Sequence, residues 1–339
     1  MAQRHPDPAD RPAGAVTGDA LADHLRARAT EFLRALRLHR EGGTGAEPDD
    51  AVRALRRSAR RISGSLHTFR PLLDAGWAES VRPELAWLSG TLALEQAYAA
   101  RLERLLLALH RLSGTPVLPA QTPGPAGSAA TERGKLALGA AKAGALLERQ
   151  LTLARTRAHS SALQALGGSR FHAVADTVAL LASEVPLTPA AATADLRPLA
   201  AAAEERLEAA VTALPLVRAG HPYNAEALVH GLSPDPSPHP QDAPWHQVRL
   251  LLRLHRYARE VLHGDDLTDV RLTAAGQALD RHRDASEAAA AAARAARTPR
   301  IAPATAYALG VLHADQRHEV EAARYAFQRS WQKQTVGTS

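Results

Sequence analysis

Two segments of the chain carry arginine and histidine at intervals of three and four residues. The first segment contains Arg53, Arg56, Arg57, Arg60 and Arg61. The second contains His246, Arg249, Arg253 and Arg256. Such intervals place side chains along one face of an α-helix, with Arg57 and Arg61 beside the first stripe. A planar guanidinium suits phosphate oxygens, and a protonated imidazole also donates to them. Both faces are therefore candidate sites for an anionic ligand.

The concentration of positive charge in these stripes is itself informative. Like charges three and four residues apart repel on a helix, and few carboxylates stand between these cations to offset them. An anionic partner would relieve the repulsion, whereas a solvated helix face is the simpler interpretation of any run of charge. His282 is a further candidate donor, with a core-edge histidine as the alternative. His67 and Tyr257 are interpreted as structural side chains. The predicted polyanion-binding residues are therefore Arg53, Arg56, Arg57, Arg60, Arg61, His246, Arg249, Arg253, Arg256 and His282.

Other kinds of chemistry find little support in the sequence. The absence of cysteine excludes disulfides, thiolate metal sites and thiol nucleophiles. No H-E-x-x-H, G-x-x-x-x-G-K-[ST], G-x-G-x-x-G or G-x-S-x-G motif occurs. Asp280 and Asp284 could form a carboxylate pair, but the neighbouring Arg281 and Arg283 favour ion pairing. We therefore expect no catalytic residue, no metal and no cofactor, and a protein that is not an enzyme.

The elements that hold these residues are predicted to be helices. Hydrophobic residues make up 45% of the chain but aromatic residues only 4%, and alanine and leucine dominate the long segments. Strands favour β-branched and aromatic residues, so this composition favours an all-α fold. Periodicity predicts helices over about 19–40, 51–70, 130–166, 169–183, 196–214, 244–263, 267–297 and 303–332, with short helices around 77–110.

The proline- and glycine-rich segments between the predicted helices indicate how the chain is divided into regions. We expect a disordered tail over 1–17, a first helical half over 18–217, a proline- and glycine-rich connection over 218–243 and a second helical half over 244–335. Arg53, Arg56 and Arg60 match His246, Arg249 and Arg253 at a constant offset of 193 residues, which favours an internal duplication. No signal peptide or spanning segment is recognisable, so a cytoplasmic location without membrane contact is expected.

Three runs of sequence carry a resemblance to a known family. The runs V-R-A-L-R-R-S-A-R-R-I-S-G-S-L-H-T-F-R-P-L-L-D (52–74), W-H-Q-V-R-L-L-L-R-L-H-R-Y-A-R-E (245–260) and L-D-R-H-R-D (279–284) resemble, in order, signatures of the CHAD domain family. The first half departs from the family pattern at Arg53, Ser63, Gln96-Ala97 and Glu204-Glu205. The resemblance implies two pseudo-symmetric helical bundles of about four helices each, arranged around a basic channel that holds inorganic polyphosphate.

The sequence thus favours non-catalytic binding of inorganic polyphosphate, with targeting to polyphosphate granules as an extension. One alternative is a nucleic-acid-binding or nucleoid-associated protein, although its basic stripes lack stacking aromatics apart from Tyr257. A second is a regulatory partner of a polyphosphate-metabolising enzyme, and a third is an enzyme that acts on polyphosphate. Competition between polyphosphate and DNA distinguishes the first two classes, and a phosphate-release assay tests an enzyme.

Overall fold

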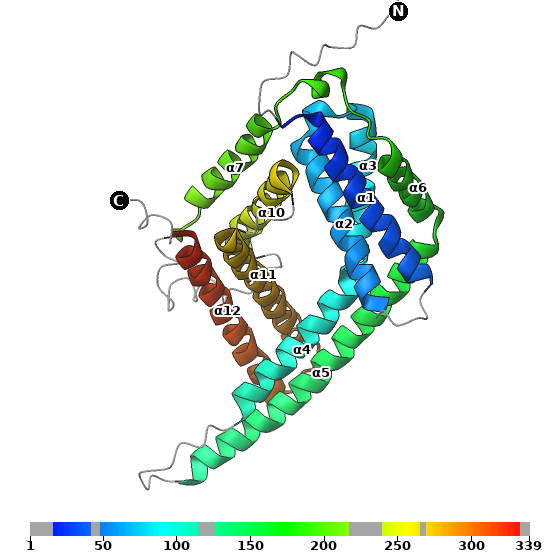
Figure 1. The fold of residues 1–339 in the computed structure, drawn as a ribbon. Helices are drawn as coiled ribbons and strands as arrows, with labels where there is room; N and C mark the ends of the chain where they lie inside the picture. The colour runs from blue at the N-terminus through cyan, green and yellow to red at the C-terminus, as the bar shows by residue number, and fades with distance from the viewer. Residues whose placement is uncertain (1–15, 42–47, 115–125, 217–238, 265–268, 333–339) are drawn as a thin grey trace, which may run out of the picture. The chain divides into compact units, whose positions relative to one another are not determined.

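The computed structural model describes residues 16–41, 48–114, 126–216, 239–264 and 269–332. Over these residues the chain is helical throughout, and its one β-type contact is an isolated bridge between Leu73 and Leu187 (Figure 1). The predicted all-α fold class is therefore confirmed. The predicted tail, apart from Val16 and Thr17, and most of the predicted 218–243 connection lie outside the described residues.

Two compact units make up the structure, and each draws on several stretches of chain. Unit 1 comprises Met1–Leu94, His159–Val211 and Leu250–Thr268, and unit 2 comprises Glu95–Ala158, Thr212–Arg249 and Asp269–Ser339. The units alternate along the sequence and do not coincide with the consecutive halves 18–217 and 244–335. The internal duplication and the two pseudo-symmetric bundles stay predictions.

Unit 1 is built on a core of leucine, isoleucine and phenylalanine. Leu21, Leu25 and Phe32 form the buried stripe of α1, as their helical spacing predicts. They join Leu55 and Ile62 of α2, which are also fully buried. The helices of this unit are α1 (Gly18–Arg40), α2 (Pro48–Thr68), α3 (Ala75–Thr91), α6 (Ser169–Ser183) and α7 (Arg197–Thr212), with the one-turn helices η2 (Arg70–Leu72) and η3 (Pro189–Ala192).

Unit 2 relies on small side chains that let helices approach closely. Its helices are α4 (Leu94–Ser113), most of α5 (Ala126–Gly167), η4 (Pro240–Asp242), α11 (Val270–Ala296) and α12 (Pro303–Gln332). Buried alanines of α11, such as Ala288 and Ala292, pack with Leu309 and Leu312 of α12 in one apolar cluster. The Asp269 carboxylate caps α11 by accepting hydrogen bonds from the backbone N–H groups of Arg271 and Leu272.

Helix α10 (Ala243–His263) contributes to both units, because residues up to Arg249 belong to unit 2 and those from Leu250 to unit 1. The second predicted basic stripe is therefore divided between the units. None of the described helices is long and apolar enough to cross a membrane.

Candidate anion-binding pocket

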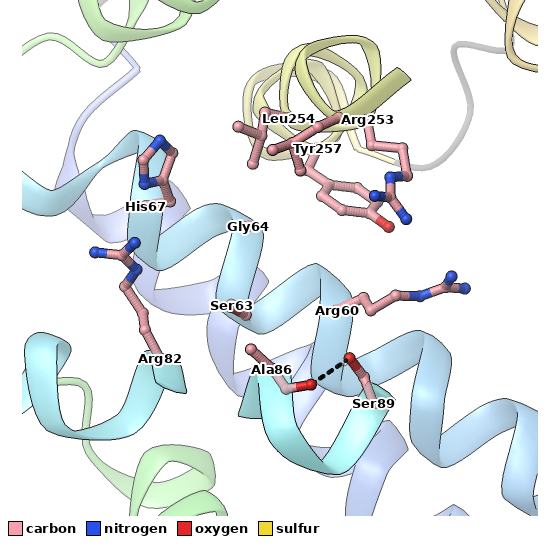
Figure 2. Close-up of a pocket in the computed structure, with 11 residues that line it drawn as sticks. Arg60, Ser63, Gly64, His67, Arg82, Ala86, Ser89, Arg253, Leu254 and Tyr257 are labelled. Atoms are coloured by element: carbon pink, nitrogen blue, oxygen red, sulfur yellow. Dashed lines mark hydrogen bonds between the residues drawn. The ribbon is translucent and has the colours of Figure 1, made fainter. Parts of the chain in front are cut away.

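Three helices of unit 1 enclose a pocket of about 350 Å³ (Figure 2). Each helix supplies residues at intervals of three and four, which bring them onto one face. The lining residues are Arg60, Ser63, Gly64 and His67 of α2, Arg82, Ala86 and Ser89 of α3, and Leu250, Arg253, Leu254 and Tyr257 of α10. Three arginines and a histidine thus line one pocket, and no carboxylate does.

Arg60 has neither an ion-pair partner nor an acceptor for its Nε among the described residues. Its side chain is half-buried, and its Nε lies out of solvent without a hydrogen-bond partner. No ion pair engages it in the described part of the chain. A buried N–H donor without an acceptor is costly. An anion in the pocket would provide the missing acceptor.

Arg82 lies across the pocket on α3 and is only partly compensated. Its Nη1 is 3.3 Å from Glu79 Oε1, which also accepts an ion pair from Arg70 at 3.1 Å. Figure 2 shows Arg82 and His67 beside each other at one end of the pocket. One carboxylate is therefore shared by two guanidinium groups, and this end also has excess positive charge.

The pKa of His67 is affected both by burial and by that excess positive charge. Burial lowers the pKa of its imidazole, and the positive charges of Arg82, Arg206 and Arg70 lower it further against the opposing effect of Glu79. The imidazole of His67 is therefore harder to protonate in the free protein than that of an ordinary histidine. A bound anion would favour its protonated form and raise its pKa.

The close contact between α2 and α10 depends on a glycine. A Cβ atom placed on Gly64 would lie 2.5 Å from Cδ2 of Tyr257. No ordinary side chain fits at that distance, so the ring of Tyr257 packs directly on the backbone of α2. The contact holds the Tyr257 ring in the wall of the pocket.

The remaining predicted residues of unit 1 have different surroundings. Arg61 forms an ion pair with Glu260, with 3.0 Å between Nε and Oε2. Arg53 pairs with Asp50 at 3.5 Å. Arg56 is half-buried, whereas Arg57 and Arg256 are exposed. The structure therefore brings only Arg60 and Arg253 of the predicted set into the pocket.

The other three predicted residues belong to unit 2. His246 and His282 lie near the buried carboxylate of Asp242, and Arg249 pairs with the exposed carboxylate of Asp280. Nε and Nη2 of Arg249 are both 2.6 Å from Asp280 Oδ1, and the Arg249 side chain is 14% exposed. His246 is half-buried, with its ring edge-on to His282 at 5.5 Å between centroids. Burial lowers the pKa of His246, partly offset by the charge of Asp242.

Asp242 is the centre of a buried polar network in unit 2. Its carboxylate is fully buried and accepts hydrogen bonds from Arg317 at 2.8 Å, from Arg324 at 2.7 Å and from the Ser286 hydroxyl. Burial alone would raise its pKa, but the nearby His282 and the hydrogen bonds and charge of Arg317 hold the pKa well below its usual range. Asp242 is thus a structural anion that links η4 to α11 and α12.

His282 belongs to this network. It is 1% exposed, its Nε2 accepts from Arg324 Nε at 3.3 Å, and its ring stacks on Trp245. Burial lowers the pKa of His282 to about 4, so the imidazole is neutral near pH 7. The prediction that His282 donates to phosphate assumed an accessible side chain that can carry a proton. The structure instead places it in the interior, a correction that follows from its contacts with α10, η4 and α12.

Sequence reasoning missed several residues of the pocket and of the network. Arg82 stands outside both stripes, although its spacing to Ala86 and Ser89 resembles that of Arg60 to Gly64 and His67. His67 and Tyr257 were interpreted as structural side chains, but both line the pocket. Asp242 falls in a proline-rich segment, where no periodic signal marks a residue as buried.

The fold and the pocket define an all-α protein with a basic pocket between helices. The chain belongs to the CHAD domain family, whose model matches residues 27–293. It is similar to the solved structure of PptA from Streptomyces chartreusis, with 70% identity and a TM-score of 0.79 over 94% of this chain and 100% of that one. The CHAD domain from the plant Ricinus communis is 16% identical, with a TM-score of 0.48 over 95% and 97% of the two chains. No curated protein matches the chain.

Proposed function

We propose that the chain binds inorganic polyphosphate without transforming it, through the pocket of unit 1 and the neighbouring basic faces of α2 and α10. The observation that carries this proposal is the lining of the pocket, to which three arginines and a histidine contribute and no carboxylate does. Membership of the CHAD domain family supports it, because the resemblance implies polyphosphate as the ligand.

Polyphosphate suits such a surface because each of its units carries negative charge and none presents a base edge. Arg60 would gain the acceptor that its buried Nε lacks. Exposed Arg57 and Arg256 lie on the same two helices and could contact further phosphates of a long chain. Guanidinium–phosphate hydrogen bonds are charge-assisted and therefore among the stronger ones.

A binding role is favoured over hydrolysis by the residue types at the pocket. Hydrolysis of a phosphoanhydride needs an activated water, which a carboxylate base or a carboxylate-held metal ion commonly supplies. The pocket lining offers arginine, histidine, serine and tyrosine instead. We extend the proposal to targeting of the protein to polyphosphate granules in the cytoplasm, which a fluorescent fusion carrying Arg60→Ala and Arg253→Ala would test.

The decisive experiment is a salt-dependent titration of the full chain with long-chain polyphosphate and with double-stranded DNA of equal charge. Polyphosphate should bind more tightly at every salt concentration. If about six cations contact phosphates, log affinity should fall against log salt with a slope of about −4. Tighter binding of DNA, or a flat salt response, would reject polyphosphate as the ligand. Release of phosphate in the presence of Mg²⁺ would reject the non-catalytic role.

A further inference from the structure

The pocket of unit 1 has an apolar side that polyphosphate cannot cover. Leu250, Leu254 and Tyr257 of α10 and Ala86 of α3 line it together with the arginines. Leu250 is 43% exposed. A ligand that covered this side chain would remove apolar surface from water, which stabilises the complex. A chain made only of phosphate units has no carbon with which to cover these side chains.

We propose that this pocket also binds a small phosphorylated molecule that carries a ring, of the class of nucleoside diphosphates. Its volume of about 350 Å³ falls within the range of small-molecule sites, which combine apolar walls with a few polar groups. This inference goes beyond the proposed function and assigns the same pocket a second kind of ligand. The two ligands would compete.

The placement of the side chains indicates how such a molecule would lie. Figure 2 shows Arg60 and Arg253 at one end of the pocket, with the Tyr257 ring beside them. The phosphates would accept hydrogen bonds from Arg60, whose Nε has no partner among the described residues. The ring would then lie against Tyr257 and Leu254.

Tyr257 is suited to this contact because Gly64 holds its position. The Tyr257 ring packs against the backbone of α2, where a Cβ atom on Gly64 would be only 2.5 Å away. A ring that is already held in place loses little conformational freedom when a ligand stacks on it. The apolar contact would therefore add to the phosphate contacts and distinguish a nucleotide from an inorganic phosphate.

The test separates the contribution of the two phosphates from that of the ring. We would titrate the full chain with ADP, with pyrophosphate and with adenosine by calorimetry. Stacking of a base on an aromatic side chain should make ADP bind at least about tenfold more tightly than pyrophosphate. Adenosine should bind weakly, since it lacks the groups that Arg60 and Arg253 recognise.

Variants then assign the preference to the pocket. Tyr257→Ala should abolish the preference for ADP over pyrophosphate, whereas Tyr257→Phe should retain it. Arg60→Ala should weaken both ligands. Tyr307→Ala is the matched control, because Tyr307 is 65% exposed on α12 in the other unit. If Tyr257→Ala does not fold by circular dichroism, Leu250→Ala removes an exposed part of the apolar side and should also reduce the preference.

The possible results separate this inference from the proposed function. Equal affinity for ADP and pyrophosphate, or a preference that survives in both Tyr257→Ala and Leu250→Ala, would overturn the nucleotide site and leave polyphosphate binding intact. Binding of long-chain polyphosphate with no binding of ADP would do the same. Binding of ADP without binding of polyphosphate would overturn the proposed function and support the nucleotide site.

Discussion

Arg60 of α2 and Arg253 of α10 line the same pocket, although 193 residues separate them in the chain. They are one of the three pairs related by the constant offset that the sequence shows. Gly64 and Tyr257, which touch across the same helix pair, have that offset as well. The recurring offset therefore coincides with a physical meeting of α2 and α10 in unit 1.

The first prediction is that Arg60 and Arg253 contribute comparably to polyphosphate binding. Each replacement by alanine should weaken affinity about tenfold, since a charge-assisted hydrogen bond contributes roughly 1.5–3 kcal/mol and solvent reduces this. The measurement is a titration of each single variant at fixed salt. Arg197→Ala, which removes an exposed charge paired with Asp195, serves as the control and should retain affinity within about twofold. Unchanged affinity for both pocket variants would show that the pocket is not the site.

The second prediction concerns Glu260, which neutralises Arg61. Glu260→Gln removes one negative charge from the basic faces and releases a guanidinium that is 23% exposed. Polyphosphate should therefore bind a few-fold more tightly, by roughly the 0.2–1 kcal/mol of an accessible ion pair. Glu84→Gln makes the same charge change at the exposed pair with Arg170. If both variants bind equally, net charge alone explains the result and Arg61 is not a ligand contact.

The third prediction is that His67 links binding to pH. Burial and nearby arginines lower its pKa in the free protein, and a bound anion raises it. The complex therefore takes up a proton on His67, and affinity should rise as pH falls from about 8 to 6. His67→Gln should reduce this rise, whereas replacement of exposed His110 on α4 should not. The measurement is the affinity at several pH values for the three proteins. An identical pH profile for His67→Gln would contradict the linkage.

Local rules predicted the helices well because the decisive signals lie close together in the sequence. The 303–332 helix, for example, agrees with α12 (Pro303–Gln332), which begins at a proline in its first turn. Leu21, Leu25 and Phe32 likewise follow the periodicity of an amphipathic helix and form the buried stripe of α1. These features depend on residues within a few turns of one another.

The site was less predictable because spacing places a residue on a face of its own helix and does not say what packs opposite. Arg249 and Arg253 are one turn apart on α10, yet Arg249 meets Asp280 and Arg253 lines the pocket. His282 satisfied the pattern of a ligand histidine but meets Asp242 and Arg324 in the interior. Only the packing of α10 and α11 against elements distant in sequence separates these outcomes.

The fourth prediction is a loss of stability in mild acid that originates at His282. Burial lowers its folded-state pKa to about 4 from the ordinary 6.5. Between these values the unfolded chain binds a proton that the native state excludes, so the free energy of unfolding should fall as pH drops from 6.5 to 4. Urea unfolding across this range measures the slope. His282→Gln should make the slope shallower, and exposed His318→Gln should not. An unchanged slope in His282→Gln would assign the acid sensitivity to other groups.

The fifth prediction tests the contact between α2 and α10 through Gly64. Gly64→Ala adds a Cβ atom 2.5 Å from Tyr257 Cδ2, so the ring or the helices must move. Overpacking of this kind costs about 1–3 kcal/mol, which outweighs the roughly 0.5–1 kcal/mol that alanine gains over glycine within a helix. Gly90→Ala is the matched control, because Gly90 lies in α3 with nothing within 4 Å of its added Cβ, and it should be neutral or stabilising.

Thermal unfolding gives the stability of both variants, and titration with polyphosphate measures the effect on the pocket. Gly64→Ala should lower both the unfolding temperature and the affinity, because a displaced Tyr257 disturbs the side chains beside Arg253. Stability equal to that of Gly90→Ala would mean that α2 and α10 do not meet at Gly64 as the structure describes.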